Sequence, residues 1–199
     1  MPPLSAFAEM APLLADGYIQ NEGGYFVVDY YWTAYLKNDG TGAARGVMEF
    51  DVSAIGSTPL KSAILTIWQL DCFNIRNATL YAYAGDGAIT VGDFDRTAVS
   101  IAGITFPAGY NFGVGVPFDT DVVTALQLAM DNNWARLGFR LETGYFSAGD
   151  IHYAAKGTSA WPYLGGQPPI LSYELVPEPA TLGLLLLGGA AVLRHRRRS

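Results

Sequence analysis

Hydrophobic and polar residues alternate along much of the chain between residues 24 and 176, which is the pattern of half-buried β-strands. Three segments place a row of apolar or small residues on one face: Gly46, Met48, Phe50 and Val52; Leu137, Phe139 and Leu141; Leu171, Tyr173 and Leu175. The opposite faces carry Arg45, Val47, Glu49 and Asp51 in the first segment, and Arg136 and Arg140 in the second. Ala63–Leu70 is apolar on both faces, as in a central strand, and Thr79–Tyr83 forms a further strand.

One segment, FDTDVVTALQLAMDNNW, has helical instead of strand periodicity. Thr120 or Asp121 is the expected N-cap, and Asn132 and Asn133 are expected to end the helix. Turn signals at residues 38–40, 56–59, 85–87 and 165–166 separate the strands. Short strands with one short helix predict an all-β fold, an antiparallel jelly-roll-like β-sandwich.

The last residues, VPEPATLGLLLLGGAAVLRHRRRS, differ from this body. Pro177, Glu178 and Pro179 precede 14 apolar or small residues, 180–193, which would form a helix of about 21 Å against roughly 30 Å of hydrocarbon. The span is expected to use Ala180, Leu182, Leu184, Leu185, Leu186, Leu187 and Leu193, followed by a cytoplasmic basic anchor of Arg194, Arg196, Arg197 and Arg198. A buried core helix would have to place these arginines at a solvated exit, and a plain tail anchor is the other alternative.

This tail resembles the C-terminal sorting signal of PEP-CTERM proteins, which occur in Gram-negative bacteria that make extracellular polysaccharide. The Pro-Glu-Pro motif, the short transmembrane run and the arginine cluster follow in the same order over about the last 24 residues. The resemblance implies recognition by an exosortase, processing near the motif, and delivery to the cell surface or extracellular matrix after transient residence in the inner membrane. Pro177, Glu178 and Pro179 would then be the recognition residues of a substrate. Prolines suit this role because they cannot continue a helix.

Three regions follow from these patterns: an N-terminal segment of residues 1–15, a β-sandwich domain of residues 16–176 and the sorting signal of residues 177–199. The first segment lacks the basic and apolar regions of an export signal, and Glu9 interrupts its apolar residues. Because the tail functions only after translocation, we expect residues 1–15 to be the remnant of a trimmed or mis-assigned export signal.

The body resembles the DNRLRE family of extracellular, carbohydrate-binding-module-like sandwiches. The matching stretches are ADGYI, RGVMEFDVSAI followed by LKSAILTI, FDTDVVTALQLAMDNNWARLGFRLE, and the closing PPILSYEL. Their order spans nearly all of residues 15–176. The resemblance implies a surface or matrix domain associated with polysaccharide, and it transfers no catalytic residue.

The charge distribution separates the body from the tail. The net charge of −6 divides into 17 acidic and 8 basic side chains in residues 1–176, and one acidic and four basic side chains in the last 23 residues. An acidic body disfavours binding to nucleic acid, because a phosphate backbone attracts basic surfaces. Cys72 is the only cysteine, so neither an internal disulfide nor a cysteine-based zinc site can form.

Few residues indicate catalysis. His152 is the only histidine outside the tail, and we expect an ordinary half-exposed residue in a strand over residues 151–155. The carboxylate pairs Asp93 with Asp95 and Asp119 with Asp121 could ligate a structural calcium ion, although capping of the helix is a simpler role for the second pair. A polysaccharide hydrolase would need two carboxylates facing across a cleft. We therefore expect no enzyme, no required cofactor and no catalytic metal.

Aromatic residues provide the alternative function. Tyr30, Trp32, Trp161 and Tyr163 are candidates for stacking on sugar rings, although strand alternation would place about half of such aromatic residues in the core. The sequence therefore predicts an exported, non-enzymatic surface or matrix protein sorted through its C-terminus. A carbohydrate-binding module is the alternative, and a polysaccharide hydrolase is the less favoured one.

Overall fold

The computed structural model describes residues 8–29, 33–38, 42–73, 77–106, 115–144, 150–154 and 167–176, and it is rich in β-strands. The described elements are β1 (Glu9–Ala11), β2 (Leu13–Glu22), β3 (Tyr25–Asp29), β4 (Thr33–Asn38), β5 (Gly42–Asp51), β6 (Leu60–Phe73), β7 (Asn77–Ala84), the 3-10 helix η1 (Val91–Asp93), β8 (Val99–Thr105), β9 (Val116–Asp121), α1 (Val123–Asp131), β10 (Arg136–Thr143), β11 (Asp150–Ala154) and β12 (Ile170–Leu175). Every described strand pair is antiparallel, which confirms the predicted all-β class with one short helix.

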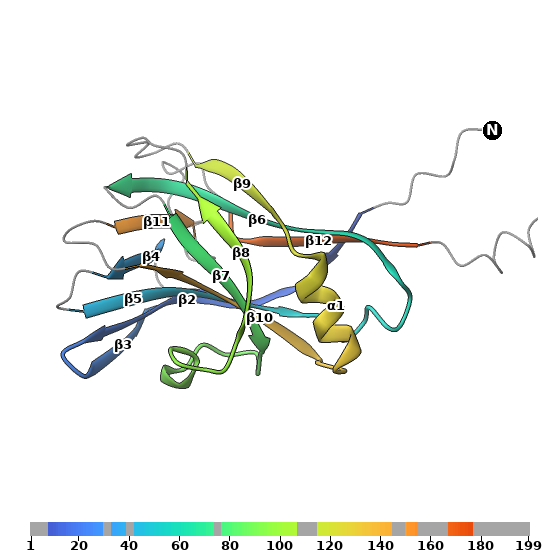
Figure 1. Cartoon of the computed structure of the whole chain (residues 1–199), viewed down its shortest axis with the longest axis horizontal. Coiled ribbons are helices and arrows are strands. Elements are labelled where there is room, and N and C mark those ends of the chain that lie inside the picture. Colours follow the sequence, from blue (N-terminus) through green and yellow to red (C-terminus); the bar gives the residue numbers. More distant parts are fainter. Residues whose placement is uncertain are drawn as a thin grey trace, which may run out of the picture.

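The strands form two layers that face each other (Figure 1). In one layer β12 lies between β1 and β6, β9 pairs with the other edge of β6, and β11 joins β6 to β4. The other layer runs β3-β2-β5-β10-β7-β8. β4 connects the layers, because its first residues pair with β11 whereas Lys37 and Asn38 pair with β5. A strand that changes sheets in this way forms a corner of a sandwich.

The apolar rows predicted from the sequence face the space between the layers. The residues Met48, Phe50, Leu137, Phe139, Leu141, Leu171 and Tyr173 all belong to the main buried core. On β6, Ala63, Leu65 and Ile67 are buried in this core, while Ile64, Thr66 and Trp68 on the other face are half-buried. The central position of Ala63–Leu70 is therefore confirmed, but its outer face keeps partial contact with solvent.

A second apolar cluster lies on the outer face of the β5–β10–β7 layer. It contains Ile19, Val47, Tyr83, Ile89 and Phe94. The segment between β7 and β8, residues 85–98, contributes the last two residues and folds back over the strands. The outer face of β5 is consequently buried as well, which a simple alternation of buried and exposed residues does not predict.

Helix α1 connects β9 to β10 at one end of the sandwich (Figure 1). Its N-cap is Val122, not Thr120 or Asp121 as expected. Asp121 still serves the helix start, because its carboxylate accepts a hydrogen bond from the Val123 N–H at 3.0 Å. The predicted C-terminus is confirmed: Asn133 has a φ of 54°, and the Trp134 N–H donates to the Ala129 carbonyl at 2.8 Å, as in a Schellman motif.

The described strands reach into the N-terminal segment of the chain. Paired strands begin at Glu9, and β2 includes residues on both sides of position 16. The division into three regions stays a prediction. The expected membrane helix of residues 180–193 lies outside the described residues. Among the residues that the structure does describe, no helix is long and apolar enough to cross a membrane.

Candidate functional site

The point where the C-terminal tail leaves the sandwich is formed by β12. This strand is paired along both edges, with Leu171 opposite Ala11 on β1 and opposite Leu65 on β6. The described hydrogen bond nearest to the C-terminus is the one that the Val176 N–H donates to the Pro59 carbonyl at 2.8 Å. The paired fold therefore extends to the residue directly before Pro177.

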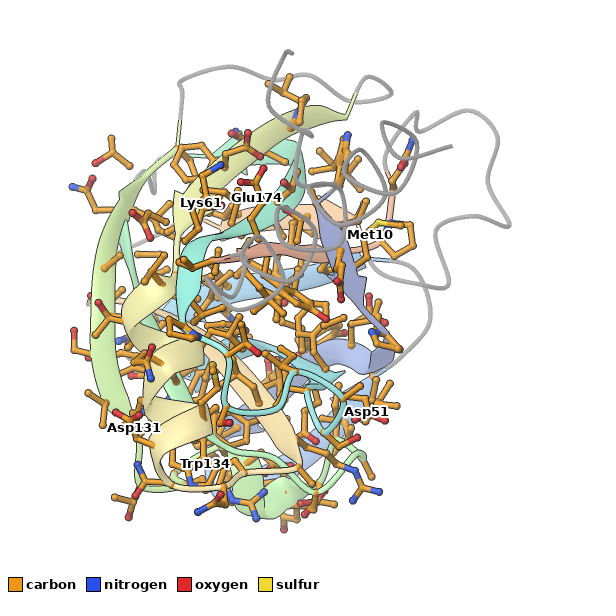
Figure 2. All side chains as sticks on the ribbon, turned by 90° about the vertical axis from the view of Figure 1, so that its right-hand side faces the viewer. Met10, Asp51, Lys61, Asp131, Trp134 and Glu174 are labelled. Atoms are coloured by element: carbon orange, nitrogen blue, oxygen red, sulfur yellow. The ribbon has the colours of Figure 1, made fainter. Side chains whose placement is uncertain are left out.

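The first and last described segments lie side by side at this exit. Glu9 is opposite Tyr173, and the Tyr173 hydroxyl donates a hydrogen bond to the Glu9 carboxylate at 2.9 Å. Burial, together with this bond and the negative charge of Glu9, raises the pKa of Tyr173 to about 12. Lys61 and Glu174 form an ion pair at 2.5 Å, and Figure 2 shows this pair and Met10 at the same end of the molecule. The first and last described strands of the domain are thus neighbours.

The functional residues predicted from the sequence lie beyond the described part of the chain. This holds for the recognition residues Pro177, Glu178 and Pro179, for the membrane span and for the arginine anchor. It also holds for the four candidate sugar-stacking residues, which are Tyr30, Trp32, Trp161 and Tyr163. These assignments remain predictions.

The candidate residues for metal binding or catalysis do not converge on one point. His152 is half-buried in β11, as expected. The Asp95 carboxylate accepts from Arg45 at 2.7 Å, and the Asp119 carboxylate accepts from the Thr66 hydroxyl at 2.6 Å. Within the described ranges, no group of three histidine, cysteine or acidic residues is placed to hold a metal ion.

A buried polar network fixes segment 85–98 to the outer face of its sheet. Glu49 on β5 is fully buried, and its carboxylate accepts hydrogen bonds from the Tyr83 hydroxyl at 3.0 Å, the Asp86 N–H at 3.0 Å and the Gly87 N–H. Gly85 leaves the room for this carboxylate, since a Cβ there would lie 2.8 Å from a Glu49 oxygen. Burial raises the pKa of Glu49, although its hydrogen bonds from Gly87 and Tyr83 oppose the shift.

Arginines hold the other half of the same segment. Arg140 donates from its Nη1 atom to the backbone carbonyls of Asp93 at 2.9 Å and Arg96 at 2.8 Å. The buried Asp93 carboxylate accepts from Arg96 at 2.6 Å and from the Thr90 N–H at 2.7 Å. Arg45 binds the Phe94 carbonyl and lies 4.0 Å from the centre of the Phe94 ring. These buried carboxylates are therefore engaged by internal donors, which suits a structural role.

Sequence patterns did not assign Glu49 and Arg140 to this network. Their alternate positions on β5 and β10 show that they share the outer face, and the glycines of residues 85–87 show a turn nearby. What covers that face depends on the path of segment 85–98, which has no strong periodicity of its own.

Comparison with known families gives one result. Residues 175–198 match the family model described as the PEP-CTERM protein-sorting motif, and this match begins at the last residue of β12. A comparison of the chain with curated proteins gave no match. The chain therefore carries a PEP-CTERM sorting motif directly after its last described strand, and this motif implies export across the membrane to the cell surface and processing by an exosortase-type sorting enzyme.

Proposed function

We propose that this chain is a non-enzymatic surface or extracellular-matrix protein, associated with exopolysaccharide, whose β-domain is delivered by its C-terminal signal. The sorting-motif match, which starts where β12 ends, carries this proposal. In it, residues 180–193 cross the inner membrane transiently, Arg194 and its neighbours stay in the cytoplasm, and Pro177–Pro179 are presented to the sorting enzyme.

The geometry of β12 supports separation of the tail from the domain. Both edges of β12 are paired, and Leu171 and Tyr173 are buried in the core. Because the last described hydrogen bond is that of the Val176 N–H, cleavage near Pro177–Pro179 would break no described strand pairing. The domain can then be released as a folded unit.

The non-enzymatic role is supported by the state of the buried carboxylates. A glycosidase needs two carboxyl groups on either side of a cleft that admits a sugar and, in inverting enzymes, a water molecule. Glu49 lies beneath segment 85–98 and Asp93 belongs to that segment. Both are fully buried, and their carboxylates accept hydrogen bonds from a tyrosine, an arginine or backbone N–H groups. These two groups serve the fold in this proposal.

The proposal includes a jelly-roll fold for the body, and the order of strand pairing supports it. Eight strands carry this order, which in the direction of the chain are β1, β5, β6, β7, β8, β9, β10 and β12. The first pairs with the eighth, the second with the seventh, the third with the sixth and the fourth with the fifth. Such nested pairing is typical of a jelly roll, in which two Greek keys form two packed sheets.

Processing at the motif can be tested by mass spectrometry of the C-terminus, with the chain expressed in cells that contain or lack the sorting enzyme. With the enzyme, the mature protein is expected to end near Pro177–Pro179 and to lack Arg194–Arg198. Glu178→Ala should abolish this processing, whereas Glu174→Ala, a matched change of a nearby carboxylate on β12, should not. An intact C-terminus in both kinds of cell would contradict the proposed function.

Removal of the tail is expected to leave the domain stable. A chain that ends at Val176 should have a Tm within about 2 °C of the full chain, because all described strands remain. A chain that ends at Pro169 provides the control: without β12 it loses two strand pairings and part of the core, so cooperative unfolding should disappear. Thermal unfolding followed by circular dichroism measures both. A large loss of stability in the first chain would show that the domain needs the tail.

A second candidate function is carbohydrate binding, and exposed aromatic surface favours it. Tyr25 at the start of β3 is 81% exposed, and its neighbours Phe26 and Val27 are also exposed. Tyrosine combines an apolar ring with a polar hydroxyl, which suits contact with a ligand or partner that has both kinds of surface. Retention of the protein on immobilised polysaccharide tests this function.

A further inference from the structure

A pocket lies at the end of the sandwich where the tail departs, between two segments that are distant in the sequence. One wall is the connection from β5 to β6, with Val52, Ser53, Gly56 and Ser57, and the other is the turn from α1 to β10, with Met130, Asn133, Trp134 and Ala135. Its volume is about 400 Å³, within the range of roughly 300–1,000 Å³ that is usual for small-molecule sites. Trp134 and Asp51, which borders the first wall, both lie on the end of the molecule seen in Figure 2.

The two walls are held in place by backbone hydrogen bonds. The Schellman motif fixes the second wall, because the N–H groups of Asn133 and Trp134 donate to the carbonyls of Met130 and Ala129 at 3.1 and 2.8 Å. The Val52 N–H donates to the Ala135 carbonyl at 3.0 Å and so joins the two walls. A pocket with this fixed geometry needs little ordering when it binds a ligand, which favours affinity.

The first wall is fixed from within its own loop. The Asp51 carboxylate accepts hydrogen bonds from the Ser53 N–H at 3.0 Å and the Ser53 hydroxyl at 2.6 Å. The Ile55 N–H donates to the Val52 carbonyl at 3.2 Å, and the buried Ile55 side chain anchors the loop in the core. Gly56 adopts a φ of 67°, a conformation that glycine reaches without strain.

The chemistry of the lining selects a neutral ligand that has both an apolar face and hydroxyl groups. Trp134, Met130 and Val52 supply apolar surface, and Ser53, Ser57 and Asn133 supply hydroxyl and amide groups. Among the described residues that line the pocket, none is charged. Three charged residues adjoin the lining along the chain. Asp51 and Asp131 accept hydrogen bonds from Ser53 and Gln127, and Arg136 donates to the Asp86 carbonyl. Their sum is one negative charge, which disfavours an anion.

We propose that this pocket binds a neutral sugar unit of a polysaccharide, with Trp134 as its stacking platform and Ser53, Ser57 and Asn133 as hydrogen-bonding partners. The proposal rests on the second candidate function and gives it a site different from the four aromatic residues predicted from the sequence. A pyranose ring has the required combination of apolar C–H face and equatorial hydroxyl groups, and large aromatic side chains provide rigid apolar area at small entropic cost.

Affinity electrophoresis of the full chain, kept in a detergent without a sugar headgroup, tests the proposal. The probes are three neutral polysaccharides, namely dextran, mixed-linkage β-glucan and galactomannan, with alginate as the anionic comparison. At least one neutral polysaccharide should retard the wild-type chain, and alginate should not. Trp134→Ala should raise the apparent dissociation constant for that polysaccharide about tenfold, whereas Trp134→Tyr should keep most of the affinity.

Trp134 packs against the core, so its replacement also affects stability. A second pair of variants therefore tests the pocket without changing Trp134. Ser57→Arg places a long charged side chain in the pocket from an exposed position and should also weaken binding about tenfold. Ala54→Arg makes the same change of charge on the same exposed loop, outside the lining, and should bind as the wild type does.

The outcomes separate this proposal from the functions on which it depends. If the wild type binds a neutral polysaccharide but Ser57→Arg binds equally well, carbohydrate binding stands and the pocket assignment is overturned. Retardation by none of the three neutral probes, or by alginate alone, overturns the pocket and its ligand class. C-terminal processing of the same variants, followed by mass spectrometry, should be unchanged in every case, because the sorting proposal does not involve the pocket.

Discussion

Replacement of Gly46 by alanine should lower the free energy of unfolding by about 3 kcal/mol, at the upper end of the usual range for overpacked cores. Gly46 lies on the inner face of β5, where a Cβ would be 2.2 Å from the hydroxyl oxygen of Tyr153 and 2.6 Å from its Cε1. Tyr153 comes from β11 in the facing layer and is completely buried. Because protein cores are close-packed, a completely buried ring is expected to move little, so the strands themselves must shift.

Two comparisons make this first prediction specific. Gly103→Ala on β8 is the matched control: no atom lies within 4 Å of its added Cβ, so stability should be unchanged or should rise by up to about 1 kcal/mol. Tyr153→Leu shortens the side chain with which the Cβ at position 46 would collide. The loss of unfolding free energy in the double variant should therefore be clearly smaller than the sum of the losses in the two single variants. Urea denaturation measures the free energy of unfolding of these four variants and of the wild type. Additive effects would show that the two residues do not share this space.

The fold was predictable from sequence where burial follows a local period. The rows that include Met48, Phe139 and Leu171 alternate with period two, and the structure places them in the core as expected. Strand β2 lacked this signal, because it has a bulge between Leu13 and Ala15 and contains polar residues such as Asp16 that are nevertheless buried. Its pairing with β5 is decided by contacts far along the chain.

The candidate sites differ in the same way. The sorting motif occupies one contiguous stretch, so its parts could be identified without any structure. The pocket at Trp134 joins residues 52–57 to residues 130–135, and neither segment has a distinctive pattern that relates it to the other. The network around Glu49 likewise depends on segment 85–98 crossing the sheet, which adds a layer that a two-layer interpretation of alternating residues omits.

Removal of the Glu49 side chain should produce the second large effect. Glu49→Ala is expected to lower the free energy of unfolding by about 3 kcal/mol, because it leaves the Tyr83 hydroxyl and the N–H groups of Asp86 and Gly87 without their acceptor under segment 85–98. Glu49→Gln keeps the shape of the side chain and one acceptor oxygen. It should therefore lower the free energy of unfolding at pH 7 by only about 1 kcal/mol. Glu174→Gln, which alters an ion pair at the surface, should stay within about 0.5 kcal/mol of the wild type.

The pH dependence distinguishes a buried carboxylate from a residue that only fills space. Since burial raises the pKa of Glu49 in the folded state, the folded protein binds this proton more tightly than the unfolded chain does. The resulting stabilisation is fully present below the unfolded pKa, near 4.5, and is lost as the pH rises through the higher folded value. The deficit of Glu49→Gln relative to the wild type should therefore widen as the pH falls from 7 to about 5 in urea denaturation. A deficit that stays constant, or that narrows at low pH, would show that Glu49 is not held in a site that favours its protonated form.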